Sequence, residues 1–133
     1  STMPVRLQGE DGRAEEEPRP SVLNRLHPSL GDVTLPTTMR CEHNPADDSV
    51  PGLKQMTEVA LRQLAHENDR GFFLMIESAS IDKQSHERKP RGSIREVEQH
   101  NEALASALEF AAAHPHTLVM VTADHTQAAQ IPP

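Results

Sequence analysis

The chain has 133 residues, a formal net charge of -7, and only 2% aromatic residues. This length predicts one modest domain, and the scarcity of aromatic side chains leaves little material for a self-sufficient core. The acidic balance argues against nucleic acid as a partner, because phosphate backbones favour clustered Lys and Arg. No apolar run is long enough to cross a bilayer and no signal-peptide pattern is visible, so we expect no membrane association.

The first third of the chain differs in character from the rest. Residues 1–48 are charged, contain prolines and show no sustained period, which predicts an irregular surface segment with one short helical turn. Residues 49–133 are ordered enough to predict a partial α/β core. Its first element is a helix, because Ser49 precedes Pro51 as a start signal and apolar residues recur at helical spacing from Leu53 to Leu64.

Two short apolar runs follow that helix. Residues 71–76 and 117–121 each predict a strand buried on both faces. Between them we expect a polar loop at residues 78–92 and an amphipathic helix to residue 113, started by a capping box of Ser93 and Glu96. Strand, loop, helix and strand form a βαβ unit with a right-handed crossover. Because two strands alone cannot cover both faces and edges, the sequence predicts the middle of a larger α/β sheet.

Metal-capable side chains follow both predicted strands. The first strand ends at Glu77, with Asp82 and His86 after it, and the second ends at the adjacent pair Asp124 and His125. In open α/β sheets, ligands bind beyond the carboxyl ends of the strands, so we expect these side chains to converge on one edge. Carboxylate with imidazole suits Zn²⁺, whereas a lone carboxylate suits Mg²⁺. Five ligands exceed the need of one zinc and indicate a site with more than one metal ion.

Each of these signals also has a purely structural interpretation. An Asp-x-x-x-His or Asp-His pair is commonly solvated surface or a loop cap, and Glu77 alone could meet a helix N-terminus. Cys41 lacks the companion residues of a nucleophile. Arg88, Arg91 and Arg95 are expected to be surface charges rather than a phosphate site. The histidines at positions 43, 66, 100, 114 and 116 share no ligand spacing and are expected to be solvated.

Several segments together resemble bacterial alkaline phosphatases. The main ones are Gly-Phe-Phe-Leu-Met-Ile-Glu-Ser-Ala-Ser-Ile-Asp-Lys-Gln-Ser-His at residues 71–86 and Val-Met-Val-Thr-Ala-Asp-His at residues 119–125. Shorter matches lie at residues 3–6, 48–51, 55–57 and 107–110. The resemblance implies that the chain is a fragment of a three-layer α/β/α sandwich with a mainly parallel central sheet, preceded by a long irregular segment. It corresponds to the middle and later part of a family member.

The resemblance implies a metal role for each matching residue. Glu77 takes the place of the Mg²⁺ carboxylate of the family. Asp82 and His86 take the places of two ligands of the first zinc, and Asp124 and His125 take those of the second zinc. The implied cofactors are therefore two Zn²⁺ and one Mg²⁺.

The resemblance also implies an activity and its partners. Lys83 takes the place of a lysine that reaches substrate phosphate, or the magnesium site, through water. Phosphate monoesters are hydrolysed in the family through a phosphoserine intermediate. The serine nucleophile and the phosphate-binding arginine fall in family segments that these residues do not match, so we expect this chain to be inactive alone.

The implied partners are phosphate monoesters or inorganic phosphate, the remainder of the phosphatase chain, and a second copy in a homodimer. The implied location is periplasmic or secreted. Two alternatives stay open: an excised, non-catalytic metal-binding fragment, and another metal-dependent phosphohydrolase or phosphomutase of the same superfamily.

Overall fold

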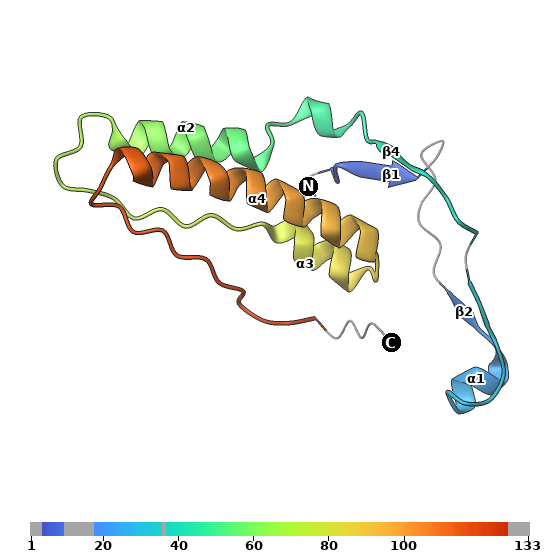
Figure 1. Ribbon diagram of the computed structural model, residues 1–133. Coiled ribbons are helices and arrows are strands. Elements are labelled where there is room, and N and C mark those ends of the chain that lie inside the picture. The colour runs from blue at the N-terminus through green and yellow to red at the C-terminus, as the bar shows by residue number, and fades with distance from the viewer. Residues whose placement is uncertain (1–3, 10–17, 36, 128–133) are drawn as a thin grey trace. The chain divides into compact units, whose positions relative to one another are not determined.

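The structure is a computed structural model that describes residues 4–9, 18–35 and 37–127 (Figure 1). These residues fall into two compact units, one formed by residues 7–44 and the other by residues 4–6 and 45–127. Helices and small antiparallel sheets are both present, so the described chain is mixed α/β. None of its described helices has both the length and the apolar character that a membrane crossing requires.

The unit of residues 7–44 contains two short antiparallel ladders. β1 (Leu7–Gly9) pairs with β4 (Cys41–His43), and β2 (Arg19–Pro20) pairs with β3 (Val33–Thr34). The short helix α1 (Val22–Leu26) lies between β2 and β3, and it begins where Ser21 Oγ accepts a hydrogen bond from Asn24 N at 3.3 Å. Ladders of two or three residues bury little surface, and most side chains of this unit are exposed.

The core of the other unit lies between α2 (Leu53–Ala65) and α4 (Pro90–Ala113), which pack side by side along much of their length (Figure 1). The buried side chains at their contact are small or of medium size: Thr57, Leu61, Ala103 and Ser106. Ser106 Oγ also donates a hydrogen bond to Glu58 Oε1 at 3.0 Å. The periodicity correctly predicted both helices, because each has one apolar stripe to bury.

The predicted start of the first helix is wrong. Ser49 lies in a separate 3-10 turn, η2 (Asp47–Ser49), and its hydroxyl donates to the carbonyl of Ala46 at 2.6 Å. The N-cap residue of α2 is Gly52, which has no side chain to cap with. Glycine is tolerated at this position, and the free N–H groups of the first turn are partly satisfied by Gln99 Oε1, 3.5 Å from Leu53 N.

The predicted capping box of α4 is also wrong. The helix starts earlier, at Pro90, whose missing N–H fits a first-turn position. Ser93 therefore lies inside the helix, and its hydroxyl donates back to the carbonyl of Lys89 at 3.3 Å. Glu96 points elsewhere and accepts a hydrogen bond from the backbone N–H of Arg6 at 3.2 Å.

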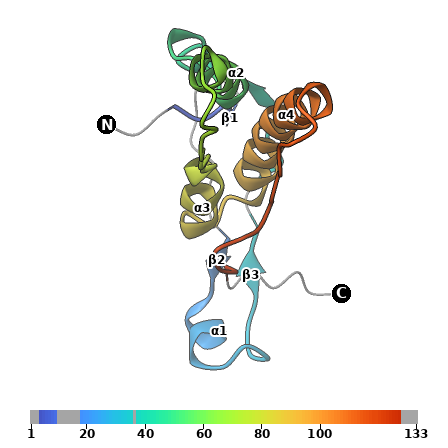
Figure 2. The ribbon, with the colours of Figure 1, turned by 90° about the vertical axis from the view of Figure 1, so that its left-hand side faces the viewer.

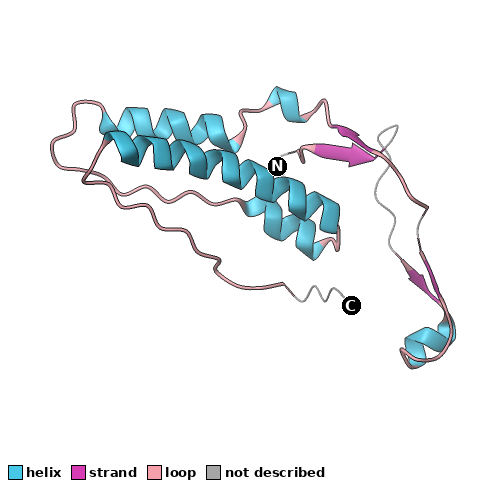
Figure 3. Ribbon diagram, in the orientation of Figure 1, coloured by secondary structure: helices cyan, strands magenta, loops and turns pink. Residues whose placement is uncertain are grey.

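The two predicted strands are extended but form no sheet among the described residues (Figure 3). Residues 71–76 and 117–121 both run back along the helical unit in the same direction (Figure 1). Their apolar side chains are largely uncovered, with Phe73 85% and Leu118 80% exposed. The prediction of paired, buried strands is therefore wrong for this chain, because a strand needs partners for its backbone groups and the described residues supply none.

Candidate metal centre

The segment between the two extended runs contains a helix rather than the predicted polar loop. α3 (Ala79–His86) occupies its first half and then turns into α4 through residues 87–89 (Figure 2). In a helix, residues four apart lie on one face. The Asp-x-x-x-His spacing of Asp82 and His86 is therefore the spacing of helical neighbours, and His86 Nε2 lies 3.4 Å from Asp82 Oδ2.

The end of the second extended segment meets this face of α3. His125 Nε2 lies 3.6 Å from Asp82 Oδ1 and 3.5 Å from Asp124 Oδ2. The backbone N–H of His125 also donates to Asp124 Oδ1 at 2.9 Å, which orients the Asp124 carboxylate. Asp82, His86, Asp124 and His125 thus form one connected group, which we call the carboxylate–imidazole cluster.

Gln127 belongs to the surroundings of this cluster. Its side-chain amide donates a hydrogen bond to Asp82 Oδ1, across 45 residues of sequence. This contact could not be predicted from the sequence, because a lone glutamine after an Asp-His pair has no distinctive spacing. Gln127 fixes the carboxylate of Asp82, and a second contact of this kind is a common way of orienting a metal ligand.

The other two residues of the predicted site, Glu77 and Lys83, form no hydrogen bond or ion pair with the cluster among the described residues. Glu77 is exposed, and Lys83 is half-buried on α3. The pKa of Glu87 lies below its ordinary value, first because Lys89 Nζ donates a hydrogen bond to Glu87 Oε2 at 2.6 Å and, to a smaller extent, because Lys83 is nearby.

The cluster brings together carboxylate and imidazole groups, the donor types that Zn²⁺ takes in proteins, although it is not a closed cage. Two ligands of one tetrahedral zinc, each about 2.0–2.1 Å from the metal, lie roughly 3.3 Å apart. The pairs Asp82–His86 and Asp124–His125, at 3.4 and 3.5 Å, match that separation. Within the described residues, however, no three His, Cys, Asp or Glu side chains are arranged to hold a metal ion together. The donors fit the metal in pairs, and completing a site requires further ligands.

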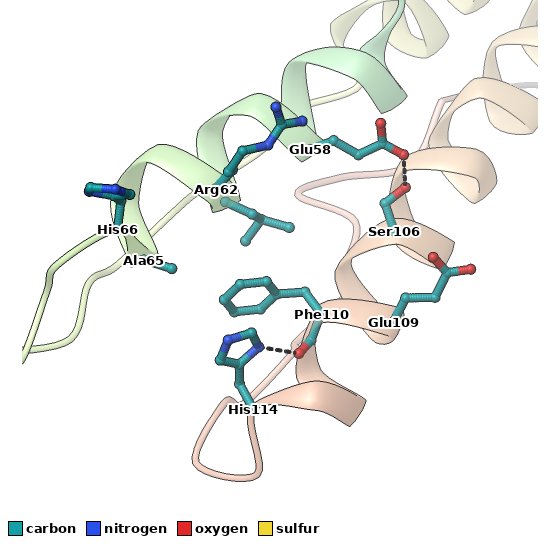
Figure 4. A pocket seen from close by; sticks show the side chains of 9 residues that line it. Glu58, Arg62, Ala65, His66, Ser106, Glu109, Phe110 and His114 are labelled. Atoms are coloured by element: carbon teal, nitrogen blue, oxygen red, sulfur yellow. Dashed lines mark hydrogen bonds between the residues drawn. The ribbon is translucent and has the colours of Figure 1, made fainter.

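A groove lies elsewhere on the helical unit, between the ends of α2 and α4 (Figure 4). It encloses about 470 Å³ and shares no residue with the cluster. Phe110 forms its apolar wall, with the ring of His114 stacked on it at 3.9 Å and the ring of Phe72 meeting it edge-on at 6.0 Å. His66 and His114 line this groove, and both are exposed, as expected for solvated histidines.

Comparison with known proteins identifies the protein family to which the chain belongs. The alkaline phosphatase family model matches residues 24–132, and the chain belongs to that family. The family is metal-dependent.

Individual members of the family are similar in sequence to this chain. Alkaline phosphatase of Escherichia coli is 49% identical over 102 residues, which cover 76% of this chain and 21% of the relative. Alkaline phosphatase H of Pseudomonas aeruginosa is 46% identical over 104 residues, covering 77% of this chain and 21% of the relative. Streptomycin-6-phosphate phosphatase of Streptomyces griseus is 47% identical over 89 residues, covering 62% and 20%. The chain thus spans about a fifth of the length of these curated relatives.

Proposed function

We propose that the chain supplies metal ligands to a phosphomonoesterase, and that phosphate monoesters are hydrolysed only when it is joined to the remainder of a phosphatase chain. The carboxylate–imidazole cluster supports this most directly. Its members come from two segments 38 or more residues apart in sequence, yet Asp82 lies within 3.6 Å of both His86 and His125. Membership of the alkaline phosphatase family supports the same proposal.

The proposed ligand assignment uses the residues as they lie in this fold. Asp82 and His86 hold the first Zn²⁺ from one face of α3, and Asp124 with His125 holds the second. Glu77, exposed and ahead of α3, is the proposed carboxylate for Mg²⁺. When bound, the ions supply Lewis acidity toward phosphate oxygens and lower the pKa of bound water.

The remaining roles fall to protein groups around these ligands. Gln127 orients the Asp82 carboxylate, and the backbone N–H of His125 orients that of Asp124. Lys83 is proposed to reach substrate phosphate, or the magnesium site, through water. The serine nucleophile of the phosphoserine route and the phosphate-binding arginine are proposed to come from outside these 133 residues, so that the chain alone is inactive.

The proposed fold of the assembled enzyme accounts for the uncovered segments. Residues 71–76 and 117–121 would become strands of a mainly parallel sheet, in an α/β/α sandwich of three layers. Their common direction and their exposed apolar side chains support this proposal (Figure 1). We further propose that the assembled enzyme is a homodimer. Its proposed location is the periplasm or the outside of the cell, after secretion.

A segment exchange tests the proposed function. In the Escherichia coli relative, the segment that matches this chain is replaced by the corresponding residues of this chain, and hydrolysis of an aryl phosphate is measured with Zn²⁺ and Mg²⁺ present. We expect turnover, and a loss of at least about 100-fold when His86→Ala is added. His116→Ala, an exposed histidine in the turn after α4, is the matched control and should retain turnover.

The outcomes separate folding from function. A chimera that unfolds thermally in the same cooperative manner as the relative, and shows no turnover, would contradict the proposal. The alternative of a non-catalytic metal-binding fragment is tested on the 133-residue chain itself by native mass spectrometry with zinc. Incomplete ligand sets lead us to expect a Kd of about micromolar or weaker, and no aryl phosphate turnover.

A further inference from the structure

α3 is held against α4 at both of its ends, and these contacts decide where the candidate ligands lie. At its far end, Gln84 is buried, Lys89 N donates to the Gln84 carbonyl at 2.9 Å, and Ser85 Oγ lies 3.0 Å from Ser93 Oγ. Gly92 leaves the space that Gln84 fills, since a Cβ there would overlap the glutamine side chain. This end is fixed by a short connection and close packing.

At the near end of α3, one side-chain hydrogen bond links the helix to α4. Ser78 is the N-cap residue of α3, yet its hydroxyl makes no capping hydrogen bond. It is instead hydrogen-bonded to His100 Nδ1, at 2.8 Å, in a partly buried position. His100 lies in the middle of α4, 22 residues further along the chain. A serine diverted from the role that its position favours indicates that the link to α4 is what the hydroxyl provides.

We propose that His100 is a positioning residue for the candidate metal centre. Through Ser78 it anchors the first turn of α3, and α3 presents Asp82 and His86 toward His125. Ser78 also directly follows Glu77, so the same contact fixes the backbone beside the proposed magnesium ligand. The affinity part of this inference rests on the proposed function, whereas the anchoring of α3 does not.

The test uses the 133-residue chain and two readouts: amide hydrogen exchange in α3 without metal, and the Kd for Zn²⁺. His100→Ala should speed exchange in the first turn of α3, including the amide of Ile81, which donates to the Ser78 carbonyl at 3.0 Å, by about 3- to 10-fold, the worth of one partly buried hydrogen bond. We expect a weakening of Zn²⁺ binding of about the same factor. Alanine is the better helix former, so faster exchange cannot come from a weakened α4.

Two further variants make the test specific. His100→Asn keeps a hydrogen-bonding group near the position of Nδ1 and has a similar helix propensity, so it should restore both readouts in part. Asn101→Ala, at an exposed neighbouring position of α4, should leave both unchanged. In the double variant Ser78→Ala/His100→Ala, exchange should be no faster than in either single variant, because both remove one contact.

The possible results decide the two proposals separately. If α3 exchanges at the wild-type rate in His100→Ala, the anchoring role is overturned, whether or not zinc binds. If exchange responds but Zn²⁺ affinity does not, the anchor stands and its role at the metal centre is overturned. If the wild-type chain binds no Zn²⁺ at all, the proposed metal function fails, and the exchange data still decide whether His100 anchors α3.

Discussion

Glu96 is a charged residue that is only 5% exposed, on the face of α4 that meets the start of the chain. Its carboxylate accepts hydrogen bonds from Arg6 N at 3.2 Å and Gln99 Nε2 at 3.3 Å. Burial raises the pKa of Glu96 above its ordinary value of 4.5, the nearby charge of Asp47 raises it further, and Arg6 opposes both. The folded protein therefore favours the protonated form more than the unfolded chain does.

This shift sets the sign of a pH dependence. Because the folded pKa is raised, the stabilising contribution of Glu96 is fully present below 4.5 and is lost as the pH rises through the raised value. Glu96→Gln is neutral at every pH, so the stability of the variant relative to wild type should rise as the pH increases above 4.5. Urea unfolding followed by circular dichroism at several pH values measures this difference.

A second variant controls for the loss of a charge. Glu109→Gln changes an exposed carboxyl on the same helix. The prediction concerns the difference in the free energy of unfolding between the two variants. This difference should grow toward neutral pH, with Glu96→Gln becoming the more stable variant. A gap that stays constant across the range, or narrows, would show that burial does not govern the titration of Glu96.

The pair α2 and α4 depends on a narrow interface with few large side chains. Leu61 is 8% exposed there, whereas Val59, two residues earlier on α2, is 51% exposed. Leu61→Ala should lower the free energy of unfolding by about 2–4 kcal/mol, because it leaves a cavity between the helices. Val59→Ala should change it by less than about 0.5 kcal/mol. Equal effects of the two substitutions, measured by urea unfolding, would mean that the helices are not held by this interface.

Elements differed in how well the sequence specified them. α2 and α4 are long and have an apolar stripe, so local periodicity was sufficient to find them. α3 has only eight residues and few apolar ones, and the same polar composition also fits a loop. The one available signal was the Asp82–His86 interval of four residues, which matches a helical turn as well as a ligand spacing.

The site was predictable only in part, because contacts between residues far apart in the sequence leave no local pattern. The proximity of His125 to Asp82 agrees with the expectation that the carboxyl ends of the two segments converge. The contacts of Gln127 with Asp82, and of Ser78 with His100, join residues whose types are common and whose spacing carries no signal. Glu77 was expected among the same group, but no hydrogen bond or ion pair joins it to the cluster among the described residues.

For the whole molecule, the uncovered extended segments predict self-association. Phe73, Met75, Leu118 and Met120 are each about 80% exposed, next to backbone groups without ladder partners. We expect the sedimentation coefficient of the 133-residue chain to rise with concentration. Phe73→Lys with Leu118→Lys should weaken the association by at least about 10-fold, since a buried charge opposes pairing.

A matched substitution makes this prediction specific to those segments. Leu108→Lys introduces the same charge at an exposed apolar position of α4, outside both extended runs. It should leave the association close to that of wild type. A wild-type chain that sediments as a 14.7 kDa monomer at all concentrations would contradict the expectation.

The ladder between β1 and β4 has a consequence for how this protein can change over evolution. Leu7 is paired with His43, so the two ends of residues 7–44 lie side by side. The ladder closes this segment at its base, and none of the buried side chains between α2 and α4 comes from its described residues. Because the entropy of closing a loop grows only slowly with its length, this excursion can lengthen, shorten or diverge while the helices stay intact.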